Sequence, residues 1–168
     1  GFELFEIKYE ICEVALCETS ENLGALGITM MDGPFFSVMP YGNMPLHTLT
    51  AVEHTPRRTS FEQLPHFPCQ ELNTACTPNI LQNCNQCPAK PHSSFKDMWQ
   101  LAKKYLRPEF QVSYKRSLYA IKPILVFSEM DDSRPTLVHT CSESPKFVTV
   151  LSGKISAIYE LESVTNGL

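Results

Sequence analysis

Short strand-like runs separated by turn residues fill the first third of this sequence. Residues 28–31 and 35–39 are typical of short buried strands and are divided by a turn at 32–34. A second turn over 41–45 leads into another strand-like run at 46–53. The pattern predicts an antiparallel meander whose loops gather at one edge of a sheet.

An earlier strand carries an irregularity. Apolar and polar residues alternate regularly over 7–11, and after Cys12 and Glu13 the apolar positions shift by one, to Val14 and Leu16. Because a one-residue slip moves side chains to the other face of a sheet, we expect a β-bulge or a strand break at this point.

Two segments have helical character. Residues 95–106 place their apolar side chains on one face, Ser94 with Asp97 resembles a capping box, and Pro108 marks the end. The second helix is expected at 155–162, after a strand. With a long alternating strand running from Phe110 toward Phe127, the prediction is an α+β fold with a mixed, largely antiparallel sheet and two main helices.

The composition of the chain limits the classes of function and partner that it fits. The chain has 168 residues, 43% of them apolar, enough for one domain with a core. A net charge of −4 and a pI near 5.7 disfavour nucleic acid as a partner. No apolar run approaches the roughly 20 residues that span a bilayer, so we expect no membrane partner and a cytoplasmic location. The start at Gly1 without a methionine suggests a fragment of a longer protein.

A turn near the C-terminus could hold negative charge. Ser152, Gly153 and Lys154 follow the strand-like run 146–151 and open the run 155–162. A helix start presents free N–H groups and a partial positive charge, to which the lysine adds a full one. An ordinary N-cap serine followed by a tight-turn glycine would explain the same residues without a ligand.

Several segments together resemble a known family. Residues 31–42, 46–54 and 55–58, the pair Arg134-Pro135, and residues 150–155 resemble the downstream half of FAD-dependent oxidoreductases of the D-amino-acid oxidase and glycerol-3-phosphate dehydrogenase type. The resemblance implies a substrate-binding (cap) domain at 1–130 and a C-terminal strand-turn-helix at 131–168 that faces the flavin.

In that family the terminal turn often carries glycine where this chain has Ser152, and the resemblance makes Ser152, Gly153 and Lys154 the cofactor-binding residues. The G-x-G-x-x-G turn that binds the FAD pyrophosphate does not occur in the sequence. The resemblance therefore implies a missing N-terminal FAD-binding region as a partner, and a chain that is inactive by itself.

The resemblance also implies a substrate site. In this family the cap sheet often supplies an arginine for a carboxylate and a tyrosine or histidine for the reacting group, which points to Tyr41, His47, Arg57 and Arg58 here. The substrate would be an amino-acid-, hydroxy-acid- or sugar-like small molecule that gives a hydride to FAD. Each of these residues also fits an ordinary edge position, and the two arginines fit a solvated charge pair.

An irregular insert at 60–92 contains Cys69, Cys76, Cys84 and Cys87 in the spacing C-x6-C-x7-C-x2-C. A zinc site, free thiols and disulfides all remain open for these four. The other cysteines lie in strand-like runs and are expected to be small core residues: Cys12, Cys17 and Cys141. A second function class is therefore a stand-alone binding or interaction module with a metal-stabilised, cysteine-rich loop.

Overall fold

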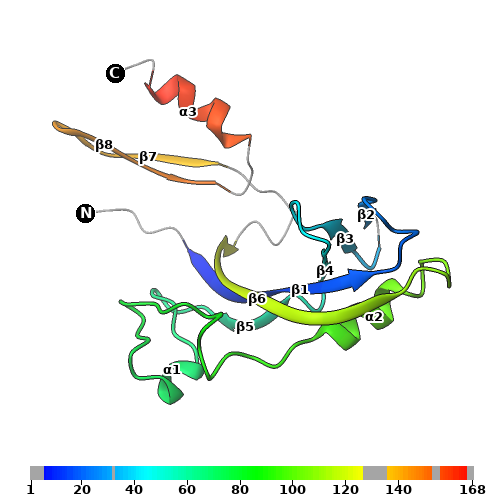
Figure 1. Cartoon of the computed structure of the whole chain (residues 1–168). Helices are drawn as coiled ribbons and strands as arrows, with labels where there is room; N and C mark the ends of the chain where they lie inside the picture. The colour runs from blue at the N-terminus through cyan, green and yellow to red at the C-terminus, as the bar shows by residue number, and fades with distance from the viewer. Residues whose placement is uncertain (1–5, 32, 127–135, 153–155, 166–168) are drawn as a thin grey trace. The chain divides into compact units, whose positions relative to one another are not determined.

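Antiparallel strand pairs form the two sheets of this protein, as the alternating sequence pattern predicts (Figure 1). The computed structural model describes residues 6–31, 33–126, 136–152 and 156–165. The chain divides into two compact units. The sheet unit is Tyr9–Lys122, and the hairpin unit combines Gly1–Lys8 with Pro123–Leu168. This division falls at 122/123, whereas the family resemblance places the change of role at 130/131.

The meander predicted from the sequence is confirmed. The strands β2 (Ile28–Met30), β3 (Phe36–Pro40) and β4 (His47–Ala51) follow one another in antiparallel pairs. β4 then pairs with the long strand β1 (Ile7–Thr19). The α+β class and the largely antiparallel sheet are thus as expected.

Three strands pair with β1. β5 (Pro56–Ser60) is antiparallel to its first half and β4 to its second half, so β4 and β5 succeed each other along one edge of β1. The long strand β6 (Val112–Leu125) also pairs with β1 and takes the remaining edge. The strands β2, β3, β4 and β1 are thus neighbours in that order, and both β5 and β6 pair with β1.

The largest hydrophobic cluster lies on one face of this sheet, and Leu16 is buried on the opposite face of β1. On the first of these faces the helix α2 (Phe95–Ala102) packs against a cluster from β1, β3 and β4, which comprises Ala15, Cys17, Phe36, Val38, Leu49, Ala51, Met98, Leu101 and Ala102. A second, smaller cluster of Ile11, Phe67 and Tyr119 joins the cysteine-rich insert to the same face of β1. The insert is irregular apart from a short helix, α1 (Cys69–Leu72).

The β-bulge expected near Cys12 and Glu13 is confirmed, because the register between β1 and β5 shifts between Ile11 and Cys12. β1 itself is continuous there, and the additional residue lies on β5, since Ile11 pairs with Arg58 and Cys12 with Pro56. The apolar parity shifts because Glu13, a charged residue, occupies a buried position on the core face.

The capping box expected at the start of α2 does not form. Ser94 is the N-cap residue but makes no side-chain cap hydrogen bond to the helix. The helix is capped instead from β1, as described below. It is also shorter than expected, because residues 103–106 form turns after Ala102.

The hairpin unit contains β7 (Leu137–Glu143), β8 (Lys146–Leu151) and the helix α3 (Ala157–Thr165). The strand-turn-helix order is therefore as predicted, but the helix begins at Ala157 rather than near Gly153. Ser152 is exposed, and Gly153 and Lys154 lie outside the described residues.

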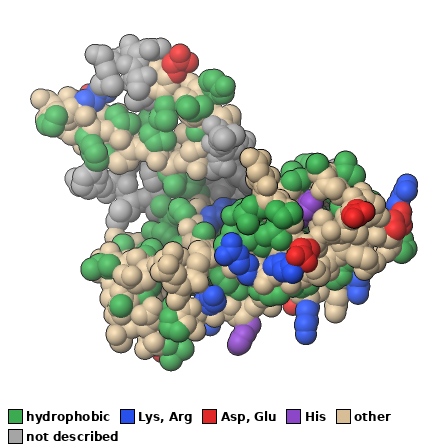
Figure 2. Space-filling view, in the orientation of Figure 1, with side chains coloured by type: hydrophobic (Ala, Val, Ile, Leu, Met, Phe, Trp, Pro, Cys, Tyr) green, Lys and Arg blue, Asp and Glu red, His purple; other side chains and the backbone are tan. Residues whose placement is uncertain are grey.

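Charges are mixed over the surface. Figure 2 shows Lys and Arg side chains interspersed with Asp and Glu on the face drawn, rather than gathered into one basic patch. In the part of the chain that the structure describes, no helix has both the length and the apolar character needed to cross a bilayer.

Candidate functional site

Glu13, whose side chain is 0% exposed, is the centre of a buried polar cluster. Alternation along β1 places it on the core face with Ile11 and Ala15. It thus lies between the cluster under α2 and the cluster under the insert. A buried carboxylate requires hydrogen bonds or a counter-charge, because burial without them is very costly.

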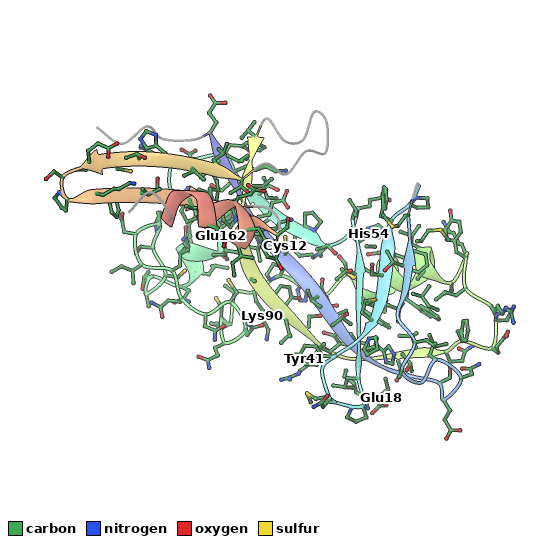
Figure 3. All side chains as sticks on the ribbon, turned by 90° about the horizontal axis from the view of Figure 1, so that it is seen from above. Cys12, Glu18, Tyr41, His54, Lys90 and Glu162 are labelled. Atoms are coloured by element: carbon green, nitrogen blue, oxygen red, sulfur yellow. The ribbon has the colours of Figure 1, made fainter. Side chains whose placement is uncertain are left out.

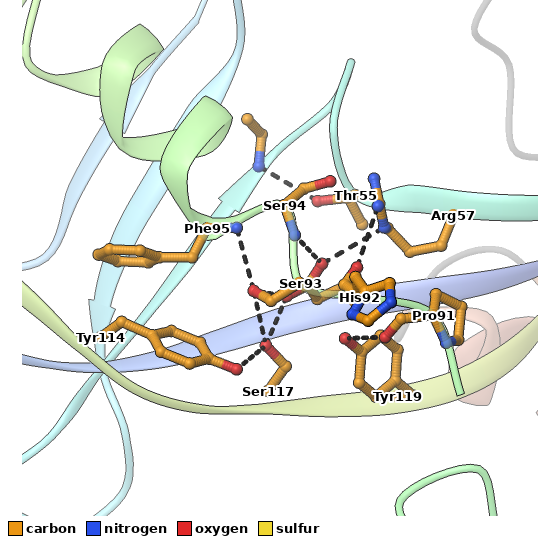
Figure 4. A network of polar contacts seen from close by, with 12 residues as sticks. Thr55, Arg57, Pro91, His92, Ser93, Ser94, Phe95, Tyr114, Ser117 and Tyr119 are labelled. Atoms are coloured by element: carbon orange, nitrogen blue, oxygen red, sulfur yellow. Dashed lines mark hydrogen bonds and ion pairs between the residues drawn. The ribbon is translucent and has the colours of Figure 1, made fainter. Parts of the chain in front are cut away.

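Both oxygens of this carboxylate are bonded, and Figure 4 labels the partners Ser93, Ser94 and Ser117. The hydroxyls of Ser93 and Ser117 donate to Oε1, the latter at 2.5 Å. The backbone N–H of Ser94 donates to Oε2 at 2.8 Å. The N–H of Phe95 donates to Ser93 Oγ at 3.0 Å, so the start of α2 is bonded to Glu13 directly and through Ser93. The carboxylate also interacts favourably with the helix dipole.

Arg57 supplies a positive charge. Its Nε lies 3.5 Å from Glu13 Oε2, and its Nη2 donates to the carbonyl of His92 at 3.0 Å. The β5 bulge explains this position, since a bulge re-aims the side chains next to it. The neighbouring Arg58 is close enough to Cys69 for its charge to act on that thiol. Both arginines are therefore directed at the insert and its ends.

Two tyrosines on β6 extend the network. The Tyr119 hydroxyl donates to the carbonyl of Pro91 at 2.9 Å, and the Tyr114 hydroxyl lies 3.0 Å from Ser117 Oγ. Burial, followed by the negative charge of Glu13, raises the pKa of Tyr119. The hydroxyl stays protonated and remains a donor at neutral pH. The network as a whole fastens the end of the insert to β1, β5 and β6.

The bonding pattern limits what Glu13 can do chemically. Two hydroxyls, one backbone N–H and one guanidinium already contact its two oxygens. A general base needs an oxygen within reach of a substrate proton. With its side chain buried and its oxygens bonded to protein donors, Glu13 is arranged as an anchor for the insert and α2, not as a base.

The four expected substrate residues do not converge in one place. Tyr41 begins the turn between β3 and β4 and is half-buried (Figure 3). His47 pairs with Cys17 of β1, whereas Arg58 pairs with Ile11. Six residues of a strand separate these two positions on β1, which corresponds to about 20 Å. Tyr41 and His47 thus belong to one end of the sheet unit, and the arginines to the other.

His47 lies on the core face and is 5% exposed. Its Nδ1 is 3.0 Å from Thr19 Oγ1, and its backbone carbonyl accepts a bond from the Cys17 thiol at 3.3 Å. The other ring nitrogen, Nε2, is buried and has no hydrogen-bond partner among the described residues. The ring is therefore held in place from one side.

Cys84 lies within electrostatic reach of the other three cysteines of the insert, although the four are spread over nineteen positions, from 69 to 87. Burial raises the pKa of Cys84, and the charges of Cys69, Cys76 and Cys87 raise it further. All are half-buried free thiols. Among the described residues, no three His, Cys, Asp or Glu side chains are already arranged to hold a metal ion.

Three residues of the central network were not found from the sequence: Glu13, Ser93 and Ser117. The available signal was the charged residue at an inward position of a strand, between Ile11 and Ala15. Such a residue indicates a buried partner elsewhere in the chain. The identity of the partners follows only from the fold.

Comparison of the chain with known protein families, characterised proteins and solved structures finds no match.

Proposed function

We propose that this chain is the substrate-binding and C-terminal portion of an FAD-dependent oxidoreductase. The substrate would be an amino-acid-, hydroxy-acid- or sugar-like small molecule that transfers a hydride to FAD. The flavin supplies the hydride acceptor when it is bound. The residues of this chain would bind and orient the substrate and keep water away from it.

The main support is that the two faces of β2, β3 and β4 differ in burial and polarity. One face packs on α2 and is dry, with Phe36, Val38 and Leu49 buried. Side chains of the opposite face are at least partly exposed, and the following are all polar except a methionine: Thr29, Ser37, Met39, Thr48 and Thr50. A rigid antiparallel platform with one face packed and one face open is suited to covering a small molecule.

Hydrogen bonds order this open face. Thr29 Oγ1 lies 3.1 Å from Ser37 Oγ, and Thr48 Oγ1 donates to the Met39 carbonyl at 3.3 Å. The Met39 side chain is 43% exposed. Two of the segments that carry the family resemblance, 31–42 and 46–58, contain β3, β4 and the start of β5. The resemblance and the open face thus share β3 and β4.

The test begins with the reading frame that contains this sequence. We expect a strand, a G-x-G-x-x-G turn and a helix upstream, and a full-length protein that purifies with stoichiometric flavin. Anaerobic mixing with panels of amino acids, hydroxy acids and sugar derivatives should bleach the flavin with one of these classes. This chain purified alone should be colourless, because it lacks the pyrophosphate-binding turn.

A full-length protein without such a segment, or one that binds no flavin, would reject the proposal. That result would favour the alternative function, a stand-alone binding or interaction module. If this chain alone purified with one equivalent of flavin, the proposal that an upstream region binds the FAD pyrophosphate would be contradicted.

A further inference from the structure

The cysteine-rich insert has little core of its own. Within residues 61–92 only Pro65, Phe67 and Gln70 are buried. Its larger apolar side chains are exposed, including Leu72 at 79%, Ile80 at 64% and Phe61 at 69%. A segment that buries so little apolar surface cannot offset the conformational entropy lost on ordering its backbone. Natural proteins stabilise such segments with a cross-link or a structural metal.

The arrangement of the thiols supplies the ligands that such a site needs. Cys69 opens α1, Cys76 follows it, and Cys84 and Cys87 belong to one turn. That turn is closed by a bond from the Cys87 N–H to the Cys84 carbonyl at 3.3 Å. A C-x-x-C turn brings two thiolates to one side, where they can chelate a single ion.

N–H groups of the insert already point at the sulfur atoms. The backbone N–H of Gln82 donates to Cys76 Sγ at 3.4 Å, and Asn73 Nδ2 donates to Cys87 Sγ at 3.4 Å. Gln70 Nε2 donates a longer bond to Cys76 Sγ, at 3.9 Å. Bonds of this kind stabilise negative charge on sulfur and orient a ligand around a metal.

The surrounding charge is also favourable. Four thiolates and one divalent ion carry a net charge of −2. Arg58 lies within electrostatic reach of Cys69, and it therefore offsets part of this charge. The two histidines that flank the insert, His66 and His92, are exposed, and the His92 carbonyl is bonded to Arg57. The ligand set that the structure favours is thus four sulfurs.

We propose that Cys69, Cys76, Cys84 and Cys87 bind one structural Zn²⁺ ion in a tetrahedral site. An S4 donor set favours zinc among the common divalent ions of cells. At a Zn–S distance of about 2.3 Å, the sulfurs of a regular tetrahedron lie about 3.8 Å apart. Because the described thiols are not yet set for an ion, binding must draw the turns that carry them together. Few buried side chains oppose this movement.

Cobalt titration tests the proposal directly. Purified without chelators or metal-affinity resin, the full chain should contain one equivalent of zinc. After removal of that zinc under reducing conditions, Co²⁺ should give the intense visible and thiolate charge-transfer bands of a tetrahedral sulfur site. These bands should saturate at one equivalent and disappear when Zn²⁺ is added.

Matched variants locate the site. The double variant Cys84→Ser/Cys87→Ser should weaken metal binding at least about tenfold. The control Cys141→Ser, a half-buried cysteine of β7 outside the insert, should leave it unchanged. Removal of zinc should also speed proteolytic cleavage within 61–92 while the strand signal in circular dichroism persists, since a structural zinc stabilises mainly what it encloses.

Two results would overturn the proposal. One is a reduced wild-type chain that shows no tetrahedral cobalt bands, or bands that survive in the double variant. The other is freshly isolated protein without zinc whose mass is lower by two hydrogens per cysteine pair, which would assign these cysteines to disulfides. Because the wild-type titration decides the first point, misfolding of a variant cannot obscure the answer.

Discussion

Glu13, in the middle of β1, accepts a hydrogen bond of 2.8 Å from the backbone N–H of Ser94, 81 residues later in the chain. Through this bond the carboxylate caps α2, and through Arg57 it also reaches the carbonyl of His92. One buried side chain thus holds the end of the insert and the beginning of the helix against the sheet.

Glu13→Ala should strongly destabilise the chain. The substitution removes the acceptor for two serine hydroxyls and one helix N–H, and it leaves Arg57 without its counter-charge. Breaking a buried pair on one side typically costs about 3–5 kcal/mol. Urea unfolding monitored by circular dichroism should show this loss, and Glu13→Gln, which keeps one acceptor oxygen, should lose less.

Glu18→Ala is the matched control on the same strand. Glu18 Oε1 lies only 2.7 Å from Lys115 Nζ, but the two side chains are 53% and 46% exposed. An exposed ion pair of this kind contributes about 0–1 kcal/mol. Equal losses for the Glu13 and Glu18 variants would show that the buried network does not anchor the fold.

A double-mutant cycle should establish the role of Arg57. If its guanidinium stabilises the buried Glu13 carboxylate, then Arg57→Met and Glu13→Gln should each lower the free energy of unfolding. The loss in the double variant should be smaller than the sum of the two single losses. A coupling of about 1–3 kcal/mol is expected for residues in one buried network. The cycle is measured on this chain without substrate, so a role in substrate binding cannot produce the coupling. Additive losses of unfolding free energy would show that Arg57 and Glu13 are not coupled.

The local pattern of the sequence predicts those parts of the fold that depend on neighbours in the chain. Strand periodicity locates β2, β3 and β4, and their short turns determine that they are antiparallel. The long strand β6 follows from the same alternation. These features need only side-chain period and turn chemistry, which a sequence displays directly.

The misread features depend on contacts between distant residues. Glu13 looks like a break in the apolar alternation because its partners Ser93 and Ser117 lie 80 and 104 residues away. The capping box at Ser94 fails for the same reason, since the carboxylate of Glu13 takes the place that a local partner would fill. Likewise the cysteine spacing shows which thiols are close in sequence, but only the fold shows that Cys69 approaches Cys84.

The stability of the chain should fall at alkaline pH in a way that depends on Cys17. This thiol is fully buried in the core under α2, and burial raises its pKa from 9.0 to about 12. Above pH 9 the unfolded chain releases the Cys17 proton while the folded chain retains it, so unfolding becomes more favourable. The stabilising contribution is complete below pH 9 and is lost as the pH rises toward 12.

The comparison of wild type with Cys17→Ala isolates this effect from other groups. Between pH 9 and 11 the wild type should lose up to about 1.4 kcal/mol per pH unit more than the variant, which is the linkage slope of one proton. Urea midpoints measured across this range in the presence of a reductant give both slopes. Parallel slopes would mean that Cys17 ionises as readily in the folded chain as in the unfolded one.

Tyr41 and His47 should separate substrate binding from folding in the proposed full-length flavoprotein. Tyr41 stands at the turn between β3 and β4 and is half-exposed, whereas His47 lies on the core face with its Nδ1 bonded to Thr19. If Tyr41 contacts the substrate, Tyr41→Phe should lower kcat/KM about tenfold, the effect of losing one hydrogen bond, without changing the unfolding free energy. His47→Gln should instead lower the unfolding free energy by about 1 kcal/mol. Steady-state kinetics and urea unfolding on the same preparations distinguish the two residues.

An unaltered kcat/KM in Tyr41→Phe would remove this turn from the substrate site. Retention of flavin and activity in the wild type would still leave the proposed oxidoreductase function intact.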